Sequence, residues 1–286
     1  MDFLRPTTWE EALAAKADRP GSVPIQGGTD VMVEINFDVR RPPALLDLTR
    51  VAELREWSMT GGLCRVGAGV PYAAVIGELA GPLPGLAQAA RTVGSPQIRN
   101  RGTVGGNLGA ASPAGDSHPP LLAAGAVVEV ESRERGVRMI PAAEFYLGVK
   151  RSALEPDELI RAVHVPPATG PQYFSKVGTR NAMVIAVCSF AIALHPRERR
   201  VGTGIGSAAP TPRRALEAEE LLAAELDWEA PLDPALLRRF GELCARAAAP
   251  IDDVRGTAAY RVHAISVMAR RTLTWAWNDH LKERAA

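Results

Sequence analysis

Two short segments of this chain combine paired glycines with polar side chains: IQGGTDV at residues 25–31 and TVGGNLG at residues 103–109. Because glycine has no Cβ, it permits positive φ angles and lets successive backbone N–H groups converge on an anion. Each segment adds groups that donate or accept hydrogen bonds, Thr29 with Asp30 in the first and Thr103 with Asn107 in the second. The two segments together predict a site for a phosphate-bearing ligand, with a pyrophosphate as the expected guest.

Neither segment fits a familiar nucleotide-binding fingerprint, because both the GxGxxG and the GxxxxGK[ST] spacings fail. GTGIGS at residues 202–207 fails as well and is typical of a strand that another piece of backbone approaches closely. Asp116 lies nine residues beyond Asn107 and is a candidate acceptor for ligand hydroxyls. Each glycine pair taken alone has a plainer interpretation as an ordinary turn. The residues by themselves therefore predict a phosphate-bearing ligand and nothing narrower.

The composition of the 286-residue chain is that of a folded protein without a polyanionic partner. Apolar residues make up 47% and charged residues 23%, and the formal charge of +1 supplies no field that would attract nucleic acid or an anionic membrane. The first residues lack the build of a secretory signal, and no uncharged apolar run is long enough to span a membrane. We expect a cytoplasmic protein with no nucleic-acid partner and no membrane span.

Metal-ligating residues are scattered along the chain. Cys64, Cys188 and Cys244 form no CxxC pair, so they read as buried small hydrophobes and cannot hold an iron–sulfur cluster through the usual spacing. The five histidines also lack metal spacing, and packing or surface roles are expected for them. For His118, which is close to Asp116, the alternative role is contact with a cofactor. No metal ligand and no catalytic residue is assigned.

The elements that must position the glycine segments follow from local patterns. Thr8 and Glu11 fit a capping box that opens a helix to about Lys16. Gly61-Gly62 and RERG at 133–136 are typical hairpin turns. The other expected elements before residue 166 are strands over 22–26, 44–48 and 158–165, a helix-like stretch up to Trp57, and helices over 71–80 and 83–93.

The chain changes character at PPATGP, residues 166–171, where we place a domain boundary. Beyond it, three strands are expected before three helices. The strands cover 172–178, 183–194 and 199–208, and the helices lie around 213–225, 234–248 and 257–278. Strands followed by helices indicate an α+β fold.

Four stretches resemble the FAD-binding subunit of the molybdenum hydroxylases, the family of the carbon monoxide dehydrogenase medium subunit and the xanthine dehydrogenase FAD domain. QGGTD (26–30) is similar to the family's first loop, and QIRNRGTVGGNLGAASPAGD (97–116) matches its second nearly throughout. Phe174-Ser175-Lys176 through Arg180 resembles a strand of the family, and DDVRGTAAYRVHAISVMARRTL (252–273) resembles its closing helix. The resemblance covers almost the whole chain.

That resemblance implies an α+β fold in two domains. A two-part FAD-binding domain of the vanillyl-alcohol oxidase/PCMH type would span residues 1–168, with subdomains at about 1–57 and 58–168. A C-terminal domain of the carbon monoxide dehydrogenase flavoprotein type would span residues 171–286, with a three-stranded antiparallel sheet and a helical bundle.

The resemblance also implies which residues bind FAD, with the diphosphate between the two glycine segments. Ile160 matches a position near the isoalloxazine ring, Lys176 a lysine near the flavin's polar edge, and Asp116 an acceptor for a ligand hydroxyl or a loop amide. Only four of the 33 basic residues are lysine, which suggests that a compact ammonium is wanted at Lys176, the alternative being an ordinary exposed lysine. The implied residues are Ile25, Gln26, Gly27, Gly28, Thr29, Asp30, Val31, Thr103, Val104, Gly105, Gly106, Asn107, Asp116, Ile160 and Lys176.

Three features depart from the family pattern. Gln26 stands where a small residue is common, and residues 181–184 replace an acidic position. The cysteine-bearing insertion that gives some relatives an extra iron–sulfur cluster is absent.

The function implied is that of an electron-transfer subunit in a dimer of heterotrimers. It would accept electrons from the [2Fe–2S] clusters of a small subunit, which receives them from a large molybdopterin subunit, and pass them to NAD, a quinone or oxygen. Two alternatives stay open: a self-contained flavin oxidase of the vanillyl-alcohol oxidase type, and a cofactor-free scaffold subunit. The oxidase is disfavoured because the segment after residue 171 is short and offers no evident acid–base cluster.

Overall fold

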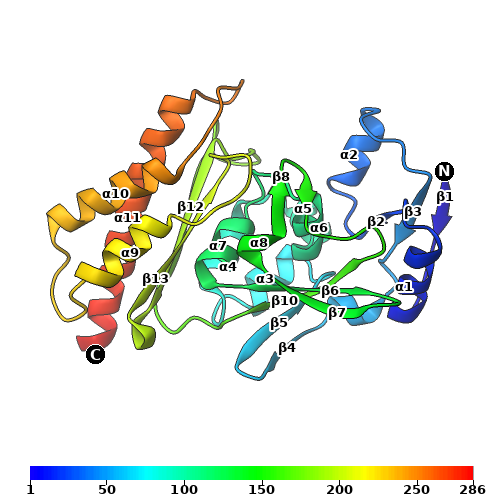
Figure 1. Ribbon diagram of the computed structural model, residues 1–286, viewed down its shortest axis with the longest axis horizontal. Helices are drawn as coiled ribbons and strands as arrows, with labels where there is room; N and C mark the ends of the chain where they lie inside the picture. Colours follow the sequence, from blue (N-terminus) through cyan, green and yellow to red (C-terminus); the bar gives the residue numbers. More distant parts are fainter. Residues whose placement is uncertain (286) are drawn as a thin grey trace.

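The computed structural model describes residues 1–285 as three blocks in a row (Figure 1). A small parallel sheet with the N-terminus lies at one end, and a five-stranded antiparallel sheet with its helices lies in the middle. A three-stranded antiparallel sheet covered by helices forms the other end. This arrangement confirms the predicted α+β class with a C-terminal three-stranded sheet.

The first block is a parallel sheet of order β1-β3-β2, built from β1 (Asp2–Leu4), β2 (Val23–Ile25) and β3 (Ala44–Asp47). The predicted first helix is confirmed as α1 (Trp9–Asp18). Thr8 is its N-cap, since its hydroxyl accepts a hydrogen bond from the N–H of Glu11. The Glu11 carboxylate accepts hydrogen bonds from Thr7, one residue earlier than the capping box predicts. A short helix, α2 (Val31–Asn36), follows the first glycine segment and was not predicted.

The second block is an antiparallel sheet of order β4-β5-β10-β6-β7. Its strands are β4 (Trp57–Thr60), β5 (Leu63–Gly67), β6 (Val127–Ser132), β7 (Gly136–Pro141) and β10 (Leu159–Val165). The predicted hairpin at Gly61-Gly62 is confirmed, and both glycines have positive φ, 60° and 78°. The central strand β10 has a register shift between Ile160 and Ala162, which marks a bulge beside the cavity described below.

Short helices accompany this sheet, and together they enclose the larger hydrophobic core, which runs from Trp9 to Val165. The two predicted helices are confirmed as α3 (Tyr72–Glu78) and α4 (Pro84–Thr92). The remaining elements are η1 (Ala52–Arg55), α5 (Pro96–Arg101), α6 (Val104–Ala110), α7 (His118–Ala124), α8 (Ala142–Phe145) and the pair β8 (Tyr146–Gly148) and β9 (Arg151–Ser152).

The third block contains the second core, which runs from Cys188 to Trp277. Its elements are β11 (Gln172–Val177), β12 (Cys188–His195), η2 (Pro196–Glu198), β13 (Arg200–Gly206), α9 (Leu216–Glu225), α10 (Pro234–Ala247) and α11 (Ala258–Ala285). The predicted start of the second strand at Met183 is wrong. Met183 has a φ of 52°, and residues 183–187 form a turn and loop before β12.

Two glycines of β13 let the second and third blocks meet backbone to backbone. A Cβ added at Gly202 would lie 2.0 Å from the carbonyl oxygen of Ala123, and one at Gly204 would lie 2.0 Å from that of Pro119. Both carbonyls belong to α7. The close approach predicted for GTGIGS is therefore confirmed.

Two further features bear on the sequence predictions. The three cysteines are free and fully buried, as predicted. No helix among residues 1–285 is both long enough and apolar enough to cross a membrane.

Candidate cofactor-binding site

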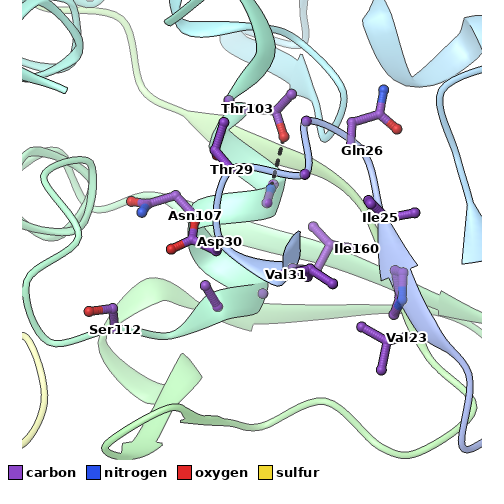
Figure 2. Close-up of a pocket in the computed structure, with 18 of the residues that line it drawn as sticks. Val23, Ile25, Gln26, Thr29, Asp30, Val31, Thr103, Asn107, Ser112 and Ile160 are labelled. Carbon is purple, nitrogen blue, oxygen red and sulfur yellow. Dashed lines mark hydrogen bonds between the residues drawn. The ribbon is translucent and has the colours of Figure 1, made fainter. Parts of the chain in front are cut away.

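A cavity of about 850 Å³ lies where the first and second blocks meet, and both glycine segments line it. Its volume falls in the range that small-molecule and cofactor sites occupy. Figure 2 shows side chains from β2, the loop before α2, α6 and β10 around this one space. The predicted residues on its wall are Ile25, Gln26, Gly27, Gly28, Thr29, Asp30, Val31, Thr103, Gly105, Gly106, Asn107, Asp116 and Ile160. Val104 and Lys176 are not among the residues that line it.

The two glycine segments touch through their backbones. A Cβ added at Gly27 would lie only 2.1 Å from the carbonyl oxygen of Arg101, just before the second segment, so no larger residue fits at Gly27. Gly28 has a φ of 74°, a conformation that glycine adopts without strain. Glycine is therefore required here both for close approach and for the turn.

The first segment presents backbone donors that the protein itself does not use. Among residues 1–285, the N–H groups of Gly27, Gly28, Thr29 and Asp30 have no backbone or side-chain acceptor. Gly27, Gly28 and Thr29 are partly buried and Asp30 is exposed, so these four donors are free to bind an external acceptor at the cavity. A loop of successive amides that line a cavity suits an anion such as a diphosphate.

The second segment is a helix rather than the predicted loop. Thr103 is the N-cap of α6, and its Oγ1 accepts the N–H of Gly106 at 3.0 Å (Figure 2). The N–H of Gly105 donates to the carbonyl oxygen of Ala68, and that of Asn107 to the carbonyl oxygen of Thr103. The amides of this segment are thus largely satisfied internally, and the free donors come from the first segment.

Packing explains the glycine at position 105. A Cβ there would lie 2.4 Å from the Cβ of Ala68, so glycine lets α6 lie directly on the residue that follows β5. Val104, which belongs to the same turn, is fully buried in the larger core. Val104 therefore packs into the core, whereas its neighbours in the segment line the cavity.

The side chain of Asn107 is held by a hydrogen-bonded chain of buried groups. Ser117 donates its hydroxyl proton to Oδ1 of Asn107, and the hydroxyl groups of Ser117 and Tyr72 lie 3.2 Å apart. This arrangement leaves the Asn107 side-chain amide nitrogen available toward the cavity wall.

Asp116 and Lys176 form an ion pair in which each side chain is 7% exposed. The Lys176 ammonium lies 2.6 Å from Oδ2 of Asp116 and 3.1 Å from the carbonyl oxygen of Thr92. Oδ1 of Asp116 is buried and has no hydrogen-bond partner among the described residues. Burial raises the pKa of the Asp116 carboxyl above its ordinary value, while Lys176 and Thr92 offset part of that rise. Lys176 therefore does not line the cavity itself but contacts Asp116, which does.

Ile160 lies on the bulged part of β10 and is 8% exposed. A Cβ added at Gly109 on α6 would lie 3.6 Å from its Cδ1, an ordinary van der Waals distance, so this side chain lies beside α6. Ile160 and Val31 both line the cavity (Figure 2). The two give this part of the cavity an apolar wall.

Sequence reasoning missed several residues of the cavity wall. Lys16 lines the cavity and is 6% exposed. Its ammonium donates hydrogen bonds to the carbonyl oxygens of Pro20 and Ser22, and burial lowers the pKa of Lys16 to about 8. Val184 and Ile185 contribute a wall from the third block. The sequence predicted a strand over Val184 and Ile185, and that prediction did not indicate that they line a cavity. For Lys16, the rarity of lysine in this chain was a signal that could have been used.

Comparisons with known proteins match both parts of the chain to described families. Residues 1–168 match the family described as the FAD binding domain in molybdopterin dehydrogenase, and residues 173–276 match the CO dehydrogenase flavoprotein C-terminal domain. The chain is 32% identical to the xanthine dehydrogenase FAD-binding subunit of Escherichia coli over 96% of its length and 95% of that protein. It is 30% identical to the carbon monoxide dehydrogenase medium chain of Afipia carboxidovorans over 96% and 95% of the two chains.

A solved structure has a similar fold. A carbon monoxide dehydrogenase chain from Hydrogenophaga pseudoflava superposes with a TM-score of 0.89 at 26% identity, covering 98% of both chains.

Proposed function

Because the chain belongs to the FAD-binding medium subunits of the molybdenum hydroxylase family, we propose that it holds FAD in the cavity described above and carries electrons between partner subunits and an outside acceptor. The observation that carries this proposal is the row of four unpaired amides from Gly27 to Asp30 on the cavity wall. A diphosphate supplies the acceptors that these amides lack.

The other residues of the cavity fit the same cofactor. The unpaired Oδ1 of Asp116 is a buried acceptor for a hydroxyl or N–H group of the ligand. Ile160 and Val31 provide an apolar surface for a planar ring, and the Thr29 hydroxyl lies beside the free amides. We assign the diphosphate to the segment from Gly27 to Asp30 and the ring to the side of Ile160.

When bound, FAD supplies the redox chemistry, since flavins exchange one or two electrons. The chain's own residues bind the cofactor, orient it and keep bulk water away from it. Lys176 is the candidate charge that biases the flavin. Its ammonium lies behind Asp116, so its influence reaches the cavity through that carboxylate.

Partners are proposed from the relatives. A medium chain and an FAD-binding subunit are, by name, parts of larger assemblies. We propose a small [2Fe–2S] subunit as the electron donor, a large molybdopterin subunit beyond it, and a dimer of such heterotrimers. NAD, a quinone or oxygen would be the acceptor. A cytoplasmic location remains a prediction.

We also propose the division into domains at residues 1–168 and 171–286. Its support is that the larger core ends at Val165 and the second core begins at Cys188, with separate buried clusters. The finer division near residue 57 has the start of β4 as its support.

The decisive experiment is a titration of the purified chain with FAD, followed by visible absorption and by equilibrium dialysis. We expect bound flavin with a stoichiometry near one. A chain that binds no flavin in equilibrium dialysis would favour the scaffold alternative. Turnover of an organic substrate with oxygen by the isolated chain would favour the self-contained oxidase, and co-purification with cluster-bearing and molybdenum-bearing chains would favour the proposal.

A further inference from the structure

Ser207 immediately follows β13 and is not among the residues that line the cavity. It is 6% exposed and has a φ of 57°, a left-handed conformation that few residues other than glycine adopt. A buried serine in this conformation persists only where surrounding contacts hold it there.

Three polar groups of Ser207 bind three different segments of the chain. Its N–H donates to the carbonyl oxygen of Pro113 at 2.8 Å. Its hydroxyl donates to the carbonyl oxygen of Ala186 at 2.7 Å. Its own carbonyl oxygen accepts a hydrogen bond from the guanidinium of Arg261 at 2.8 Å.

Two of these segments are walls of the cavity. Pro113 stands between Ser112 and Ala114, and both of these neighbours line the cavity. Ala186 follows Ile185, which also lines it. The first wall comes from the block that carries the second glycine segment, and the other from the C-terminal block. Ser207 therefore links two walls that are distant in sequence.

The third segment is the start of the closing helix, for which the family resemblance suggests no role. Arg261 is 3% exposed, and its guanidinium also forms an ion pair with Asp253. A Cβ added at Gly256 in the same turn would lie 3.1 Å from the side chain of Val187. The turn before α11 thus packs against the loop that Ser207 holds.

We propose that Ser207 is a positioning residue of the cofactor cavity. Its hydroxyl fixes the wall at Val184 and Ile185, its amide fixes the wall from Ser112 to Asp116, and Arg261 holds Ser207 itself in place. This inference rests on the proposed function, because it takes the distance between the two walls to be the one that bound FAD requires.

The test compares Ser207→Gly with the wild type and with Ser189→Ala. Glycine accepts the left-handed backbone and keeps both backbone hydrogen bonds, so only the link to Ala186 is lost. Ser189 is 1% exposed on the neighbouring strand β12, and its hydroxyl forms no hydrogen bond with either cavity wall among residues 1–285, so its alanine variant removes a buried hydroxyl of the same sheet.

For Ser207→Gly we expect a thermal midpoint close to that of the wild type. The Kd for FAD should rise roughly 2- to 10-fold, the factor that corresponds to one neutral hydrogen bond. Iodide should also quench the fluorescence of the bound flavin more strongly. Ser189→Ala should leave the Kd and the quenching unchanged.

The inference is overturned if Ser207→Gly binds FAD with wild-type affinity and quenching, or if both variants weaken binding equally. A wild type that binds no FAD would instead reject the proposed function itself. Should Ser207→Gly fail to fold, Ser207→Ala removes the same hydroxyl, and the same two measurements decide the matter.

Discussion

The ammonium of Lys176 lies 2.6 Å from Oδ2 of Asp116, and this pair joins β11 of the C-terminal block to the loop that follows α6. Both side chains are almost completely buried, so each neutralises a charge that would otherwise be isolated. Removing one partner of a buried ion pair is far more costly than removing both.

For Lys176→Met we therefore expect the free energy of unfolding to fall by about 3–5 kcal/mol. The double variant Lys176→Met/Asp116→Asn should recover a large part of this loss, because it leaves no charge unpaired. Urea unfolding of the wild type, both single variants and the double variant measures the coupling. Additive losses would show that the two side chains do not stabilise each other.

The same pair should influence the bound flavin. If Lys176→Met retains FAD, the negative side chain beside the cavity loses its counterion, so we expect the flavin reduction potential to fall. Potentiometry with a reference dye measures this, with Lys282→Met on the exposed end of α11 as the control. An unchanged potential in Lys176→Met would remove Lys176 from the tuning of the flavin.

Gly27 should tolerate no side chain. A methyl group at Gly27 would meet the carbonyl oxygen of Arg101, so we expect Gly27→Ala to lower the free energy of unfolding by about 1–3 kcal/mol. The displaced loop should also lose its hold on FAD. Gly77→Ala is a suitable control, since nothing lies within 4 Å of the new methyl group, and we expect it to stabilise α3 by about 0.5–1 kcal/mol. Normal FAD retention by Gly27→Ala would contradict the close contact.

Two threonine caps allow stability and cofactor binding to be separated. Thr103→Ala and Thr8→Ala each remove a hydroxyl that accepts an N–H at a helix start, so each should cost about 1 kcal/mol in the free energy of unfolding. Only Thr103 lines the cavity. We expect a higher Kd for FAD in Thr103→Ala alone, by equilibrium dialysis, and equal Kd values for the two variants would argue against a role for the start of α6.

His118 should make the protein sensitive to acid. Burial lowers the pKa of His118 from its ordinary 6.5 to about 3, so the unfolded chain binds a proton between these values while the folded chain does not. Stability should therefore decline as the pH falls below about 6.5, with a contribution of about 1.4 kcal/mol per pH unit from this residue.

Chemical denaturation between pH 4 and 7 tests this prediction, with His118→Asn as the comparison. In the wild type the Tyr146 hydroxyl lies 2.8 Å from Nδ1 of His118, and the side-chain carbonyl of an asparagine can accept a hydrogen bond from that hydroxyl. The slope of stability against pH should be shallower in the variant. Identical slopes would mean that His118 takes up its proton equally in the folded and the unfolded chain.

Much of the cavity could be predicted from residue types, while its geometry could not. The glycines at positions 27 and 28 signal close approach and positive φ, and both are found. Residues 103–109 were expected to form a loop because their glycines suit a backbone cradle for an anion. The Thr103 cap and the packing of Gly105 on Ala68 favour a helix instead, and neither contact can be read from a local pattern.

The loop before β12 shows a second limit of local patterns. The apolar run from Met183 to Leu194 predicts one continuous strand, yet its first residues turn away and bring Val184 and Ile185 to the cavity. Ser207 holds that turn from a distant part of the chain, so the reason for it lies outside any local window.

The four unpaired amides between Gly27 and Asp30 have a consequence for measurement. With no acceptor within the described chain, their protons should exchange with deuterated solvent at nearly the rate of an open peptide. A ligand that accepts hydrogen bonds from them would slow this exchange. The loop can therefore serve as an internal gauge of occupancy that needs neither colour nor turnover.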